Sequence, residues 1–232
     1  MSEIKKIIFS SLFILYFIIG FNSTQLNGQI GIEIIGVDSK FNEWDKLIDD
    51  YANEDYNFFD YEVGGGINYW FRLKEYRVEF TPGFYYLYSK FKYDNPSCSY
   101  EYHYQSLGTE FDINLYPFDF MRRTYEKDCP SFNNRGQWFS KSFFFQFSPG
   151  LYVSKMDLSG KDIIDYDMAG KFDFGIGVDM KLSNHILLAP ILKYGFLLGQ
   201  EWKGLGDFHG EPAYNEITSG NFLSFTLSFY LK

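Results

Sequence analysis

The sequence is poor in basic residues, histidine and cysteine, residue types on which nucleic-acid binding and much enzyme chemistry depend. It has two cysteines and three histidines in 232 residues, and its 21 basic residues are outnumbered by 30 acidic ones, for a net charge of -9. Nucleic-acid binding needs a basic surface, so this charge argues against it. The sequence contains no Walker or Rossmann loop and no CxxC pair. A mean hydropathy of -0.24 also argues against a bundle of membrane helices.

The N-terminus has the pattern of a secretory signal peptide. Lys5 and Lys6 precede an apolar run over residues 7–21, and a polar stretch then leads to Gly28 and Gln29. That run is shorter than the ~20 residues of a membrane-spanning helix. We therefore predict a signal peptide over 1–28 and a mature domain over 29–232; an uncleaved membrane anchor is the alternative. No cysteine lies near the predicted cleavage point, which argues against a lipoprotein.

Beyond residue 28, apolar and polar residues alternate in repeated stretches. This period of two is the pattern of a β-strand with two different faces. In the last stretch, Leu223, Phe225 and Leu227 alternate with Ser224 and Thr226. Most stretches reach the ~9–11 residues that a tilted strand needs to cross a bilayer. The eight predicted strands cover residues 30–37, 59–72, 76–88, 106–115, 142–153, 171–182, 185–198 and 223–231.

The connections between these strands follow the rule for a barrel whose N-terminus is periplasmic. Short turns are then expected on the inner side and long loops on the outer side. The inner connections at 73–75 and 183–184 are tight. Residues 117–141 are long for an inner turn, and we interpret them as an inserted loop; a hidden hairpin, giving ten strands, is the alternative. The predicted outer loops are 38–58, 89–103, 155–166 and 199–221.

The composition of the two strand faces favours a membrane barrel over a soluble one. In a membrane barrel the apolar face contacts lipid and the polar face lines the lumen. Here the polar face is rich in Gly, Ser, Asn and Thr, which suits the narrow interior of eight strands. Aromatic residues also gather near strand ends, as in the girdles of outer-membrane barrels. These pairs are Tyr69 and Trp70, Tyr86 and Tyr88, Tyr116 and Phe118, and Tyr194 and Phe196.

These patterns predict an all-β fold, an eight-stranded antiparallel up-and-down transmembrane β-barrel. The alternative is a soluble ligand-binding barrel of lipocalin type, although the chain lacks a Gly-x-Trp near the mature start. In the membrane barrel, charged residues of both signs face the lumen, where each unpaired charge would be costly. We expect them to form an ion-pair and hydrogen-bond network that plugs the lumen. The predicted set is Glu33, Glu62, Glu79, Glu110, Asp112, Asp173 and Asp179 with Arg72, Arg77, Lys171, Lys181 and Lys193.

Four segments carry a resemblance to a known family: 27–29, 147–151 (FSPGL), 189–194 (APILKY) and 223–231. In these segments the chain resembles the small outer-membrane β-barrel domain family of Bacteroidota (PorT-like). The resemblance covers nearly the whole mature chain and implies insertion by the barrel-assembly machinery, which recognises the C-terminal strand. The chain ends in Lys232, with Phe229 and Tyr230 just inside. The family supplies no catalytic residues.

Candidate chemical sites are few. His103 lies near Glu101 and Ser106 in the sequence, whereas His185 falls in a predicted inner turn and His209 lies in an outer loop. A membrane-embedded hydrolase, the enzymatic alternative, needs a histidine beside a serine or an acidic residue at the outer rim. These spacings are non-specific, so we predict solvated loop histidines, no catalytic residues and no cofactor.

The first outer loop is acidic, yet it lacks the ligand order and central glycine of an EF-hand. A solvated loop without a metal ion is expected, and a divalent cation bridging it to lipopolysaccharide is the alternative. One short helix is predicted over residues 43–52. The acidic residues are Asp38, Glu43, Asp45, Asp49, Asp50, Glu54 and Asp55.

The two cysteines are predicted to be unpaired. The predicted topology puts Cys98 in an outer loop and Cys129 in the inner connection. The two ends of the barrel are ~25 Å apart, whereas bridged Cα atoms lie within ~7 Å.

The sequence thus predicts a monomeric barrel in the bacterial outer membrane, with a plugged lumen and no enzymatic activity. Its role would be structural, adhesive or partner-binding through the outer loops, or that of an accessory to a protein secretion system. The expected partners are outer-membrane lipids, lipopolysaccharide and other envelope proteins.

Overall fold

The computed structural model describes the strands and their immediate ends. The described residues are 29–41, 44–46, 61–72, 78–95, 98–117, 143–159, 163–183, 186–202 and 218–231. The predicted signal peptide over 1–28 and most of the 117–141 connection lie outside them. Of the helix predicted over 43–52, residues 44–46 are described, and they are helical. Among the described residues, no helix has the length and hydropathy to cross a membrane.

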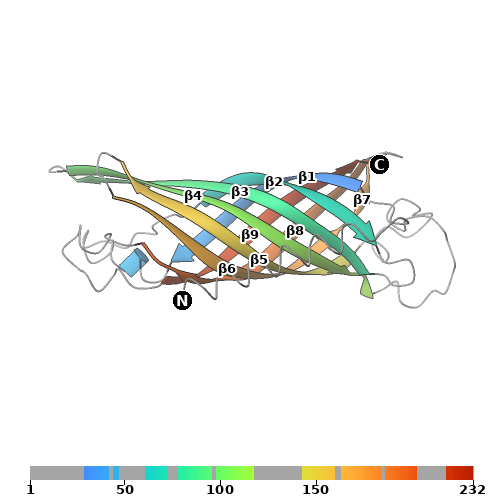
Figure 1. The fold of residues 1–232 in the computed structure, drawn as a ribbon. Helices are drawn as coiled ribbons and strands as arrows, with labels where there is room; N and C mark the ends of the chain where they lie inside the picture. Colours follow the sequence, from blue (N-terminus) through green and yellow to red (C-terminus); the bar gives the residue numbers. More distant parts are fainter. Residues whose placement is uncertain are drawn as a thin grey trace.

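Nine strand segments form one antiparallel sheet that closes on itself (Figure 1). β1 pairs with both β2 and β9, while β6 pairs with β5 and β8, so the sheet has no open side. β6 and β7 are one strand interrupted at Asp179, and both pair with β8. The barrel therefore has eight strands, as predicted. The segments are β1 Gln29–Phe41, β2 Tyr61–Arg72, β3 Val78–Asn95, β4 Cys98–Leu115, β5 Phe143–Leu158, β6 Ile163–Val178, β7 Met180–Lys181, β8 Ile186–Gln200 and β9 Thr218–Leu231.

The ten-stranded alternative is wrong. β4 pairs directly with β5 over a register that runs from Tyr102 opposite Leu158 to Leu115 opposite Phe145. No strand can lie between two strands that share hydrogen bonds over this length. The barrel wall thus passes from β4 to β5 without an inserted hairpin.

Two of the predicted outer loops are instead continuations of strands. β3 and β4 stay paired out to Asn95 opposite Cys98, and β5 and β6 out to Leu158 opposite Ile163. The predicted loops at 89–103 and 155–166 are therefore wrong. Backbone pairing continues there although the outward side chains become polar, so the apolar alternation that marked the strands is lost. The start of β1 and the end of β9 lie together at the other end, where Ile30 pairs with Leu231, and the β3–β4 hairpin projects away from them (Figure 1).

The two faces are arranged as predicted for a membrane barrel. Phe174 and Phe225 on the apolar face are 58% and 53% exposed, and Phe80 packs on Phe111 on the same outer surface, with ring centroids 5.6 Å apart. The alternating polar residues are buried in the lumen. A soluble ligand-binding barrel requires the reverse arrangement, so the lipocalin-type alternative is wrong.

Glycines let lumen aromatics lie flat against the wall. A Cβ placed on Gly177 would come within 2.3 Å of the Phe144 ring, and one on Gly108 within 2.5 Å of the Tyr152 ring. Such distances are far below van der Waals contact. Both glycines are therefore part of the packing that fills the lumen.

Candidate functional site: the plugged lumen and the outer surface

An ion-pair cluster occupies the middle of the lumen. Glu110 on β4 accepts hydrogen bonds from Lys171 of β6 at 2.6 Å and from Lys193 of β8 at 3.2 Å. Lys171 also lies 3.0 Å from Asp173, and Lys193 lies 3.5 Å from Asp112. All five residues are buried. Because β4 and β8 are three strands apart around the wall, the cluster joins opposite sides of the barrel.

Further buried hydrogen bonds lie within the lumen. Tyr152 donates to Glu110 from β5. Glu33 on β1 accepts hydrogen bonds from Asn68 and from Ser228, each at 2.6 Å. The predicted polar lumen is therefore confirmed for its central part. Buried side chains thus join β1 to β2 and β9, and β4 to β5, β6 and β8, in addition to the backbone pairing.

The predicted lumen charges fall into two groups. All seven predicted acidic residues are buried, whereas only two of the basic ones, Lys171 and Lys193, are. Arg72 and Lys181 are half-buried where β2 and β7 end, and Arg77 lies outside the described residues. Acidic groups therefore outnumber the basic groups inside the described barrel.

An aromatic cluster closes the lumen at the end where β1 begins and β9 ends. Trp70 donates its indole hydrogen to Glu79 at 2.8 Å, and the Tyr116 hydroxyl lies 2.6 Å from Glu79 and 2.7 Å from Asp179. Phe144 packs on Tyr116, with ring centroids 5.4 Å apart. Trp70 and Tyr116 thus belong to the lumen, and their predicted place in an aromatic girdle is wrong. Phe118 lies outside the described residues.

A second aromatic cluster fills the opposite end. Trp44, from the helical residues after β1, stacks on Phe41 at 4.9 Å and meets Trp202 edge-on at 5.8 Å. Tyr102 packs against Trp202 at 6.1 Å, and Tyr104 hydrogen-bonds Ser154 at 3.0 Å. Trp44, Trp202 and Tyr102 have no exposed surface. The residues that follow β1 and β8 therefore pack into the mouth of the barrel.

A small pocket remains between the outer aromatic cluster and the central ion pairs. Its volume is about 30 Å³, and its wall includes Glu62, Leu87, Tyr152, Lys171 and Phe222. A site of this size and polarity holds a few water molecules. Glu62 is held by a hydrogen bond from Ser39. The pocket is too small for an organic substrate, so it belongs to the plug.

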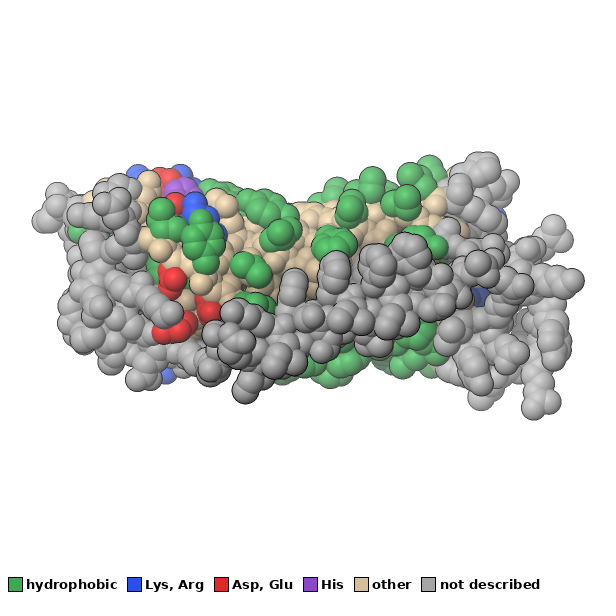
Figure 2. Space-filling view, viewed as in Figure 1, with side chains coloured by type: hydrophobic (Ala, Val, Ile, Leu, Met, Phe, Trp, Pro, Cys, Tyr) green, Lys and Arg blue, Asp and Glu red, His purple; other side chains and the backbone are tan. Residues whose placement is uncertain are grey.

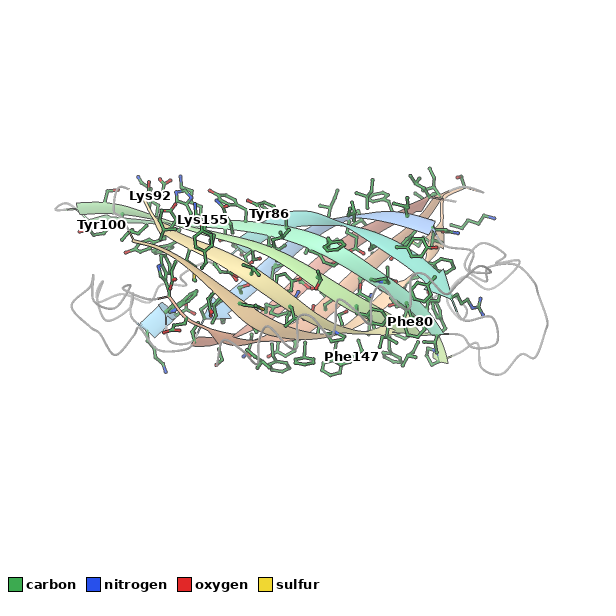
Figure 3. The ribbon with its side chains drawn as sticks, in the orientation of Figure 1. Phe80, Tyr86, Lys92, Tyr100, Phe147 and Lys155 are labelled. Carbon is green, nitrogen blue, oxygen red and sulfur yellow. The ribbon has the colours of Figure 1, made fainter. Side chains whose placement is uncertain are left out.

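The outer surface carries an apolar belt that includes exposed tyrosines. In Figure 2, patches of apolar side chains lie along the visible wall, and charged ones gather at the end where the β3–β4 hairpin projects in Figure 1. Tyr69, Tyr86 and Tyr194 are between 41% and 46% exposed. Figure 3 shows Phe80, Phe147 and Tyr86 pointing away from the barrel. This is the surface that hydrocarbon solvates in a membrane barrel.

The histidine considered for hydrolysis does not face its serine. His103 points outward, with Nε2 2.9 Å from Glu101 and Nδ1 3.0 Å from the Tyr88 hydroxyl, whereas Ser106 is buried in the lumen. Residues three apart on a strand lie on opposite faces. His103 and Ser106 therefore cannot form a catalytic pair, and His185 and His209 lie outside the described residues.

The remaining site predictions are only partly within the described residues. Asp38 lies on β1 and Asp45 accepts a hydrogen bond from the Phe41 amide at 3.0 Å; the other acidic residues of the first loop are not described. Over the described part of the chain, no cluster of three or more metal-ligating side chains occurs. Cys98 begins β4, and Cys129 is outside the described residues, so the two unpaired thiols stay a prediction.

The chain matches no protein-family model and no curated protein. Among solved structures it is similar to Neisserial surface protein A, with 8% identity over 87% of this chain and 95% of that one and a TM-score of 0.46. It is also similar to Ail, the attachment invasion locus protein of Yersinia pestis, in complex with the heparin analogue sucrose octasulfate (8% identity, 89% and 99% covered, TM-score 0.41). A third is the N-terminal β-barrel domain of Pseudomonas aeruginosa OprF (13%, 86% and 99%, TM-score 0.29). Because the sequence identities and TM-scores are this low, the fold assignment rests on the strand pairing of the chain itself.

Proposed function

We propose that this protein is an integral outer-membrane barrel that acts through its outer end, with a structural, adhesive or partner-binding role. The observation that carries the proposal is the combination of an apolar outside with an ionic inside. A wall of exposed phenylalanine and leucine is unfavourable in water and favourable in hydrocarbon. A closed barrel also satisfies its backbone hydrogen bonds internally, as a bilayer requires.

The length of the apolar belt fits a bilayer. On β4 the outward row from Leu115 to Leu107 is apolar apart from Thr109. With a rise of ~3.4 Å per residue and a tilt of ~40°, the eight steps between these two residues span ~21 Å along the barrel axis. The apolar band of known outer-membrane barrels is ~25 Å tall.

The plug argues against a role as an open channel. Ion pairs from Lys171 and Lys193 cross the middle of the lumen, and aromatic clusters occupy both of its ends. An enzymatic role has no support from the described histidine. The parts left to act are the hairpin of β3 and β4 and the other segments at the outer end, which fits recognition or adhesion.

Two measurements test the proposal: the cellular fraction in which the protein is found, and its ion conductance in planar bilayers. We expect the full chain to fractionate with outer membranes and to migrate faster on gels before boiling than after it. Purified protein in planar bilayers should show no large, steady conductance. Recovery in the aqueous phase after detergent partition would contradict the membrane assignment, and a stable open conductance would contradict the plugged lumen. Capture of envelope proteins by the wild-type chain, compared with a chain lacking 91–100, would then identify partners of the hairpin.

A further inference from the structure

The outward residues of β3, β4 and β5 change character abruptly at one level of the barrel. Tyr86, Leu107 and Val153 lie side by side across the three strands and are exposed apolar residues. The next row toward the projecting end is Tyr88, Gln105 and Lys155, followed by Lys90, His103 and Asp157, and then by Lys92 beside Glu101. The apolar belt therefore ends directly against a charged patch.

This border patch, formed by Lys90, Lys92, Glu101, His103, Lys155 and Asp157, is basic on an acidic protein. It has three lysines against two carboxylates, whereas the whole chain carries -9. Figure 3 shows Lys92 and Lys155 pointing outward at the same end of the barrel as Tyr100, away from Phe80 and Phe147 of the belt. Positive charge is thus concentrated where the belt meets the headgroup layer.

The patch is ordered rather than a loose group of side chains. Lys90 Nζ lies 2.7 Å from Glu101, which also receives His103 Nε2, and the other nitrogen of His103 lies against Tyr88. Lys155 lies 3.3 Å from Asp157. Exposed ion pairs of this kind are weak, since water and salt screen them. An anion with more charge than one carboxylate can therefore compete for these lysines.

We propose that the border patch binds the phosphate groups of a lipopolysaccharide headgroup in the outer leaflet. This inference rests on the proposed outer-membrane location. Three points carry it: the lysines lie directly above the apolar belt, their charge is opposite to that of phosphate, and Tyr88 and Tyr166 flank them with rings suited to the interface. Lysines at this depth gain from anionic headgroups. The acyl chains of the same lipid would lie along the Tyr86 and Leu107 row.

The test measures lipid binding to the purified full chain in dodecyl maltoside micelles by native mass spectrometry. The probes are lipid A with both phosphates and the same lipid A with both phosphates removed. Wild-type protein should retain the phosphorylated form at least about tenfold more tightly. The Lys90→Gln/Lys92→Gln/Lys155→Gln variant should lose this preference, and Lys46→Gln, an exposed lysine outside the patch, should keep it.

A second pair of variants keeps the test decisive if the triple variant folds poorly. Glu101→Gln and Asp157→Asn each remove a carboxylate that competes for a lysine, so each should tighten retention of phosphorylated lipid A a few-fold. Heat-modifiable gel mobility establishes folding of every variant.

Equal retention of both lipids by wild type, an unchanged preference in a folded triple variant, or weaker retention by Glu101→Gln would overturn the proposal. Equal affinity for soluble heparin would assign the patch to a soluble polyanion and also overturn it. Because the measurement is made in micelles, it is independent of the fractionation result.

Discussion

Lys193 and Glu110 come from strands that are three positions apart around the barrel wall, and their side chains meet in the lumen at 3.2 Å. The pair therefore spans the interior rather than joining neighbouring strands. With Lys171 on the other oxygen of Glu110 at 2.6 Å, it fixes the distance between opposite walls. Buried ion pairs therefore take the place in this lumen that apolar side chains have in the core of a soluble protein.

Removing one cation from this core should destabilise the barrel strongly. Lys193→Met keeps much of the side-chain volume but leaves Glu110 and Asp112 with one buried partner fewer. Loss of one member of a buried ion pair costs about 3–5 kcal/mol, because the remaining charge stays desolvated. Urea unfolding in detergent or vesicles, followed by gel mobility, measures the loss.

The control for this variant is Lys46→Met, which removes an exposed lysine and should change the unfolding free energy little. Adding Glu110→Gln to Lys193→Met should recover part of the stability, since a buried charge is removed together with its partner. A Lys193→Met protein as stable as wild type would show that the central ion pair does not support the fold.

Two glycines of β6 provide a matched comparison of lumen and surface. A Cβ on Gly177 would meet the Phe144 ring at 2.3 Å, whereas one on Gly170 meets no atom within 4 Å. Gly177→Ala should therefore cost about 1–3 kcal/mol through overpacking. Gly170→Ala should be neutral or slightly stabilising, because alanine has less backbone freedom to lose. Thermal unfolding of the two variants side by side checks the difference, and equal stability would contradict the tight fit of Phe144 on the wall.

The strands and their two faces could be predicted because lipid and lumen select opposite side chains at alternating positions. Phe172 and Phe174 are exposed and Lys171 and Asp173 are buried in the structure, as the alternation predicts. The fold therefore follows from a period of two within the belt. The same alternation also predicts the lumen position of two aromatic residues that were assigned to the girdle. Trp70 lies two residues from the lumen residue Asn68, and Tyr116 lies two residues from Asn114, so both rings face the lumen.

The strand ends could not be predicted in this way. Beyond the belt, outward residues such as Lys92 and Glu101 are solvated, so both faces of the hairpin become polar and the alternation disappears. Backbone hydrogen bonds still pair the two strands to Asn95 and Cys98. The partners of the lumen charges were also unpredictable, because the meeting of Lys193 with Glu110 depends on closure of the whole barrel.

At the outer border, Glu101 should titrate below its ordinary range. The hydrogen bond from Lys90 is the main cause that lowers the pKa of Glu101 from its ordinary value of 4.5, with a smaller effect of His103. Lys90→Met should therefore raise the pKa of Glu101 more than His103→Gln does. Carbon-13 NMR titration of glutamate carboxyls in micelles measures both shifts, and a larger effect of the histidine variant would contradict the geometry.

The sign of the linked stability follows from the lowered pKa. A carboxyl whose pKa is lower in the folded than in the unfolded state stabilises the fold at pH values above the ordinary 4.5. This contribution is lost as the pH falls through the lowered value. The difference in unfolding midpoint between wild type and Glu101→Gln should thus be constant near neutral pH and disappear in acid.

The depth of a charge on the outer wall distinguishes a bilayer from water as the surroundings. Phe174 lies near the middle of the outward row from Met168 to Leu182 that β6 and β7 share, while Leu182 ends that row just after β7, and the two are 58% and 59% exposed. In a bilayer, Phe174→Lys should cost about 2–4 kcal/mol and Leu182→Lys only about 0–1 kcal/mol. In water both lysines would be solvated equally. Urea unfolding from phosphatidylcholine vesicles, with Phe174→Leu as the apolar control, measures this difference. Equal effects of the two lysines would remove the physical basis for a membrane-spanning wall.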